Sequence, residues 1–180
     1  MKTNKYESHE EIKDINLGIS LYLINDKKFL GAFSEAEILN FYNIQNGKIN
    51  LITSLKNISC SYGRQICCLI NNNILIVGGI EQKGFYLIDI KKSIIIGIIN
   101  DFNINRVHSI IKLKNGNILA GVADKEWRSN LYELKFEKNK LIKIKELEYY
   151  YNEGEIYGLC ELKDNKICYR AYYGNVIILK

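Results

Sequence analysis

Residues 107–124, VHSIIKLKNGNILAGVAD, contain the pattern that decides the fold. Ser109, Ile111 and Leu113 alternate with other side chains, so they share one face of an extended strand. Asn115 and Gly116 follow directly, and an Asn-Gly pair is a strong signal for a tight hairpin turn. An apolar run over residues 118–123 completes the segment. Together these features predict a β-hairpin.

The same pattern occurs four times along the chain. Its anchor leucines are Leu23, Leu69, Leu113 and Leu162, at spacings of 46, 44 and 49 residues. The other turn pairs are Asn25-Asp26, Asn71-Asn72 and Asp164-Asn165, all of residue types that tolerate positive φ. The predicted second strands are 29–33, 74–79, 118–123 and 167–171, the third strands are 38–44, 85–90, 131–136 and 176–179, and shorter fourth strands are 49–55, 94–99 and 141–147.

Four antiparallel strands that repeat about every 45 residues are typical of β-propeller blades. We therefore predict an all-β chain that forms one propeller-type domain over residues 1–180, with blades at about 16–57, 58–101, 102–149 and 150–180. The fourth unit ends after its third strand. Three arrangements fit this pattern. They are a closed four-bladed ring in which residues 1–15 supply the closing strand, a half-propeller completed by a partner or a second copy, and a part of a larger propeller.

The third unit resembles a WD-type repeat. In this unit, a strand–turn–strand over residues 107–124 is followed by a polar residue. The third strand, in residues 130–134 (NLYEL), then ends on an aromatic residue and an acid. The corresponding dipeptides are Tyr42-Asn43, Ile88-Asp89, Tyr132-Glu133 and Ile178-Leu179. Only Asp89 and Glu133 keep the acid, and the Trp and the Gly-His pair of the family are missing. The resemblance covers residues 16–180 and implies a divergent WD-like or quinoprotein-like propeller.

The composition is that of a globular protein, with 47% hydrophobic and 25% charged residues and a net charge of +5. The longest apolar run, residues 94–99, is far too short to span a membrane. The first residues lack the apolar region of a signal peptide. We expect a cytoplasmic location. The spacing of the five cysteines does not match a metal site, so we predict that they are reduced thiols that face the core. They are Cys60, Cys67, Cys68, Cys160 and Cys168.

Catalytic chemistry is not indicated by any motif. His9 and His108 lie on different units, which excludes a three-His metal site, and His108 is predicted to be a structural or surface imidazole. A Ser109–His108–Asp124 triad is rejected because adjacent strand residues point to opposite faces. Two nearby acids, Glu153 and Glu155, do not by themselves define a glycosidase pair. We predict no enzymatic activity, no cofactor and no metal. The alternative is an enzyme or carbohydrate-binding propeller with a site at the central channel.

A binding surface is the stronger hypothesis. Loops between the second and third strands and between successive units emerge on one face of a propeller. Trp, Tyr and Arg dominate the binding energy of protein interfaces. The candidate interaction residues on this face are Arg64, Trp127, Arg128, Tyr151, Tyr172 and Tyr173. We expect protein partners, self-association or completion of a larger propeller. The mild positive charge does not favour nucleic acid, and no membrane binding is expected.

Overall fold

The structure of the protein, a computed structural model, describes residues 20–25, 28–33, 38–46, 48–59, 66–81, 84–147, 155–174 and 176–179. For residues 20–33 it describes the backbone alone. The strands are β1 (Ser20–Asn25), β2 (Lys28–Phe33), β3 (Ile38–Gln45), β4 (Lys48–Lys56), β5 (Cys67–Leu69), β6 (Ile74–Gly78), β7 (Phe85–Asp89), β8 (Ile94–Ile99), β9 (Ile104–Lys112), β10 (Ile118–Asp124), β11 (Ser129–Glu137), β12 (Lys140–Leu147), β13 (Ile156–Glu161), β14 (Ile167–Ala171) and β15 (Val176–Leu179). In the described part of the chain, no helix has the length and hydropathy needed to cross a membrane.

These strands form four antiparallel sheets, each built from consecutive strands. The sheet orders are β1-β2-β3-β4, β5-β6-β7-β8, β12-β11-β10-β9 and β13-β14-β15. The predicted fold class, an all-β chain of propeller blades, is confirmed. The fourth sheet has three strands among the described residues. The segment 1–15, predicted as a closing strand, lies outside them.

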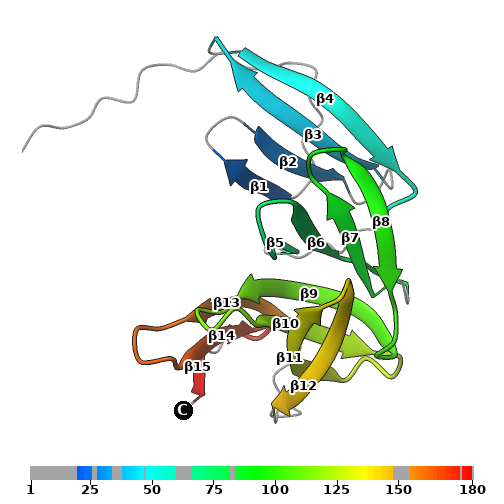
Figure 1. Ribbon diagram of the computed structural model, residues 1–180. Helices are drawn as coiled ribbons and strands as arrows, with labels where there is room; N and C mark the ends of the chain where they lie inside the picture. The colour runs from blue at the N-terminus through cyan, green and yellow to red at the C-terminus, as the bar shows by residue number, and fades with distance from the viewer. Residues whose placement is uncertain are drawn as a thin grey trace, which may run out of the picture.

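The four sheets follow one another along an arc (Figure 1). An apolar core fills each space between neighbouring sheets. Leu39 and Leu75 belong to the core between the first and second sheets, Ile76 and Ile110 to the next one, and Leu119 to the core between the third and fourth. An inner strand therefore contributes to two cores. This explains why all seven residues of β10 are buried, since both of its faces are covered.

The hairpins of the second, third and fourth units close with the same backbone hydrogen bond. In each unit a residue just after the first strand donates its NH to a carbonyl four residues on, from Ile70 at 2.9 Å and from Leu113 and Leu162 at 2.8 Å. The second-unit equivalent of Leu113 is thus Ile70, and the sequence alignment on Leu69 was wrong by one residue. The second turn is built around Asn71, whose Oδ1 accepts hydrogen bonds from the NH groups of Asn73 and Ile74.

The fourth sheet has one uncovered face within the described part of the chain. Val176 is 66% and Ile178 is 54% exposed there. Cys160 is also exposed and Cys168 is half-buried, whereas Cys67 and Cys68 are buried. The prediction of core-facing thiols is therefore wrong for Cys160 and Cys168, because no described sheet covers their side of the fourth sheet, which faces away from the third. The described residues do not close a ring.

Candidate interaction face

The loop between β10 and β11 is held by the carboxylate of Asp124. Its Oδ1 accepts the backbone NH groups of Glu126 and Arg128, both at 2.9 Å. Its Oδ2 accepts Nε of Arg128 at 2.7 Å. Burial raises the pKa of Asp124, but these hydrogen bonds outweigh it and hold the pKa below its usual value. The carboxylate therefore stays ionised and fixes the loop.

This loop presents Trp127 in a strained conformation. Trp127 has φ of 61°, a left-handed value that is unusual for a bulky residue. Its backbone NH donates to the Asp124 carbonyl at 3.0 Å, which closes the turn. The indole remains 57% exposed. Strain of this kind persists only where surrounding contacts impose it, and it is concentrated at functional positions.

Replacing Asp124 with Ala is expected to lower the free energy of unfolding by about 2 kcal/mol, because a partly buried charge-assisted network is lost. Urea unfolding followed by Trp127 fluorescence measures this change. Asp101→Ala, at an exposed aspartate in another turn, is the control and is expected to change stability by less than about 0.5 kcal/mol. Equal effects of the two substitutions would contradict the role assigned to Asp124.

Arg106 supports Trp127 from β9. The guanidinium carbon lies 5.2 Å from the centre of the indole ring, a cation–π contact. The same guanidinium lies on the other side near Glu155, with 3.7 Å between Nη1 and Oε1. Glu155 also accepts a short hydrogen bond from the hydroxyl of Tyr157. Arg106 thus links the Trp127 loop of the third sheet to the start of the fourth.

A β-bulge in β9 places His108 in this cluster. The pairing of β9 with β10 skips His108, which is left as the extra residue. As a result, His108 and the next residue, Ser109, both contact β13. The His108 imidazole lies 5.8 Å from the Tyr157 ring, and Ser109 Oγ donates to the Ile156 carbonyl at 3.0 Å. The expectation that Ser109 and His108 lie on opposite sides fails here. The triad is still not formed, since the Asp124 carboxylate is held by its own loop.

His108 is a buried, neutral imidazole. It is 1% exposed, and its Nε2 has no hydrogen-bond partner. Its Nδ1 lies 3.7 Å from Glu155 Oε2, too far for a hydrogen bond. Burial lowers the pKa of His108 to about 4, with Glu155 opposing and Arg106 assisting the shift. This burial agrees with the prediction of a structural imidazole, but the unpartnered Nε2 differs from the expectation that its hydrogen bonds are satisfied.

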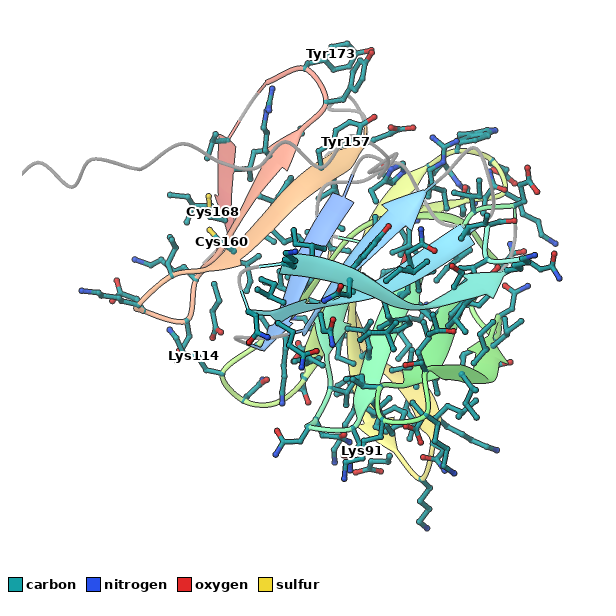
Figure 2. All side chains as sticks on the ribbon, turned by 90° about the horizontal axis from the view of Figure 1, so that it is seen from above. Lys91, Lys114, Tyr157, Cys160, Cys168 and Tyr173 are labelled. Carbon is teal, nitrogen blue, oxygen red and sulfur yellow. The ribbon has the colours of Figure 1, made fainter. Side chains whose placement is uncertain are left out.

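Aromatic rings extend the cluster along the fourth sheet. The ring of Tyr157 lies 5.8 Å from that of Tyr172, which lies 5.3 Å from Tyr173. Tyr172 and Tyr173 are 58% and 72% exposed, and both follow β14. Figure 2 shows Tyr157 and Tyr173 toward the same end of the fourth sheet. Burial, together with the hydrogen bond to Glu155, raises the pKa of Tyr157 to about 12, so its phenol stays protonated.

We call this cluster the interaction face; its members are Arg106, His108, Trp127, Glu155, Tyr157, Tyr172 and Tyr173. Of the predicted residues, the structure places Trp127, Tyr172 and Tyr173 on it. Arg128 adjoins it but bonds Asp124 and Glu126. Arg64 and Tyr151 lie outside the described residues.

Sequence reasoning missed four members of this cluster, which are Arg106, His108, Glu155 and Tyr157. Arg106 and Glu155 lie in the connections between successive predicted units, which was the available signal, but nothing local indicated that the two side chains meet. Within the described ranges, no three His, Cys, Asp or Glu side chains gather as metal ligands.

Comparison with solved structures identifies the fold. The chain is similar to the WD40 β-propeller domain of Doa1, with a TM-score of 0.62 and 17% identity over 89% of this chain and 49% of that one. It is similar to a chain of a mitotic checkpoint complex, with a TM-score of 0.71 and 11% identity over 90% and 50%. The tricorn protease matches with a TM-score of 0.52 and 15% identity over 84% and 15%.

The chain therefore spans about half the length of the first two of these proteins. No family model matches the sequence, and no curated protein matches it. At these identities the likeness concerns the fold alone, and propellers serve both binding proteins and enzymes. The predicted resemblance to WD-repeat propellers is confirmed at the level of the fold: the chain is an array of β-propeller blades of the kind found in WD40 domains.

Proposed function

We propose that this protein is a non-enzymatic protein-interaction scaffold and that the interaction face is its contact surface. The observation that carries the proposal is Trp127, an exposed indole on a strained backbone that a buried carboxylate and a cation–π contact hold in one position. Trp is among the residues that contribute most to binding energy.

Pre-organisation supports the same proposal. A side chain that is already fixed loses little conformational entropy when a partner binds. Trp127 is fixed by its turn, and Tyr172 is flanked by the rings of Tyr157 and Tyr173. Tyrosines add large apolar area with a polar tip, which suits a surface that is wet when free and buried when bound. One structural neighbour comes from a mitotic checkpoint complex, which is consistent with a protein partner.

The polar side chains of the interaction face bind one another, as expected for a rigid scaffold. Arg106 and Glu155 pair with each other across two sheets, and Glu155 accepts the Tyr157 hydroxyl. The neutral imidazole of His108 lies beneath them and is 1% exposed. A buried imidazole and a paired carboxylate are poorly placed to exchange protons with a ligand, so binding without bond chemistry is the function proposed.

The test uses Trp127→Ala. The immobilised chain captures partners from a cell lysate, mass spectrometry identifies them, and the purified partner is then titrated against each variant by calorimetry. We expect Trp127→Ala to weaken binding by about thirtyfold or more, the loss that defines an interface hot spot. Thermal unfolding of the variant checks that the fold is kept.

The matched control is Ile98→Ala, which removes a comparably exposed apolar side chain from β8, on the second sheet. Its affinity is expected to stay within about twofold of the unchanged protein, the range typical of residues outside a hot spot. If Trp127→Ala folds and binds as tightly as Ile98→Ala, Trp127 is a structural cover and the proposed face is wrong.

A further inference from the structure

Two cysteines face each other across the fourth sheet. Cys160 in β13 pairs directly with Cys168 in β14 in the antiparallel register. Both thiols are free, the first exposed and the second half-buried. Their side chains lie on the same face of the sheet, because directly opposed residues of an antiparallel pair project to one side. Figure 2 shows the two sulfur atoms next to each other on neighbouring strands.

The repeat explains why this pair is accessible. Counted from the hairpin hydrogen bond, Cys160 occupies the position of Cys68 in the second unit and Ile111 in the third. Cys68 lies in the core between the second and third sheets, and Ile111 packs against the core between the third and fourth. These two side chains are covered by the following sheet. Cys160 projects from the face of the fourth sheet that no described residue covers.

The backbone geometry suits a covalent bond between the two sulfurs. Residues directly opposite each other in an antiparallel pair have Cα atoms about 4.5–5.5 Å apart. Disulfides connect Cα atoms about 4.4–6.8 Å apart. The Cα separation therefore fits a disulfide, and closing the bond requires the two Cβ atoms, ordinarily about 4.5–5.5 Å apart across a ladder, to approach to about 3.5–4.5 Å. We propose that Cys160 and Cys168 are a redox-modification site, which forms a reversible cross-strand disulfide by exchange with a small-molecule disulfide.

The reaction proceeds in two exchange steps. The Cys160 thiol loses its proton and its thiolate attacks one sulfur of the small disulfide, which breaks that bond and releases one small thiolate. The Cys168 thiolate then attacks the Cys160 sulfur and releases the second. The two protons lost by the cysteines end on the two released thiols. The protein pair is oxidised by two electrons, and the small disulfide is reduced.

The order of attack follows from exposure. Cys160 is reached by solvent, whereas burial and the neighbouring Cys160 raise the pKa of the half-buried Cys168. A thiol with a raised pKa provides little thiolate for a first attack from solution. Once Cys160 holds the mixed disulfide, the second attack is intramolecular and is favoured by proximity.

Cys67 and Cys68 provide an internal contrast. They are adjacent on β5 and enter different cores, Cys67 the one between the first and second sheets and Cys68 the next. Their side chains therefore point apart, and the two thiols do not face each other. Burial raises the pKa of Cys68 to about 12. Both thiols are expected to remain reduced under the conditions that oxidise Cys160 and Cys168.

The experiment incubates the native chain in mixtures of reduced and oxidised glutathione, blocks free thiols with N-ethylmaleimide and maps the peptides by mass spectrometry. A Cys60→Ser version removes the one cysteine that lies outside the described residues, and the unchanged chain is mapped in parallel. We expect a peptide pair linked through Cys160 and Cys168, lighter by two hydrogens, which dithiothreitol reverses. In the Cys168→Ser variant, the reaction is expected to stop at a glutathione adduct on Cys160. The Cys67→Ala variant is expected to form the Cys160–Cys168 disulfide normally.

Two results overturn the proposal. One is that Cys160 and Cys168 are both recovered as maleimide adducts from the most oxidising mixture. The other is that Cys160 links to a cysteine other than Cys168, within the chain or in a second chain. Peptide mapping identifies which cysteines are linked. The unchanged chain is therefore sufficient to test the proposal, even if a variant fails to fold.

Discussion

Gly78→Ala is expected to lower the free energy of unfolding by about 2–3 kcal/mol, within the range for overpacked cores. A Cβ atom at this position lies 2.6 Å from both Cβ and Cγ1 of Val107, the first-strand residue of the next sheet. Atoms attached directly to the backbone of β9 cannot rotate away, so the second and third sheets must separate. Urea unfolding measures the loss.

Gly121→Ala tests the same contact one blade later. A Cβ there lies 2.9 Å from Cβ and Cγ2 of Ile156, so a similar loss is expected between the third and fourth sheets. Gly97→Ala on β8 is the matched control, because its Cβ meets only Leu87 Cδ1 at 3.9 Å. The Gly97 variant is expected to be as stable as the unchanged protein or slightly more so. Equal stability of all three variants would contradict close sheet contact at the two glycines.

Acidification from pH 6.5 to pH 4 is expected to cost about 3 kcal/mol of stability through His108 alone. Its pKa is lowered from 6.5 to about 4 by burial. Between these two values the unfolded chain binds a proton that the folded protein does not. Stability therefore rises with pH across this window and is lost as the pH falls. Chemical unfolding at a series of pH values measures the effect.

His108→Leu is expected to remove this part of the pH dependence. Leucine is similar in size and leaves no buried nitrogen without a partner, so stability near neutral pH is expected to be equal or higher. Ser109→Ala, at the adjacent buried position, removes no titrating group and is expected to keep the slope. An unchanged slope in His108→Leu would show that His108 is charged when folded, and NMR titration of the imidazole gives an independent check.

Most of the fold could be predicted from local sequence. The predicted strand 94–99 agrees with β8, 167–171 with β14 and 176–179 with β15, and the other second, third and fourth strands differ by one or two residues at their ends. Alternation and turn residues act over a few positions, so they can be recognised without tertiary information. The alignment failed by one residue at Leu69 because three consecutive asparagines do not show where the turn begins.

The candidate site was only partly predictable. Trp127, Tyr172 and Tyr173 were chosen because exposed aromatic residues in propeller loops suit binding, and in the structure contacts of Arg106, Glu155 and Tyr157 connect them. The contact of Arg106 with Trp127 and Glu155 joins segments far apart in sequence. No pattern along the chain encodes that contact.

The sequence by itself determined the class of fold, the repeat and the hairpins, because these depend on alternation and turn chemistry within each unit. Only the tertiary structure decided that a bulge turns His108 into the space beside the fourth sheet and that Cys160 lies on an uncovered face. Both facts depend on which sheet packs against which. A repeat cannot specify this, because equivalent residues such as Ile111 and Cys160 have the same local pattern but different neighbours.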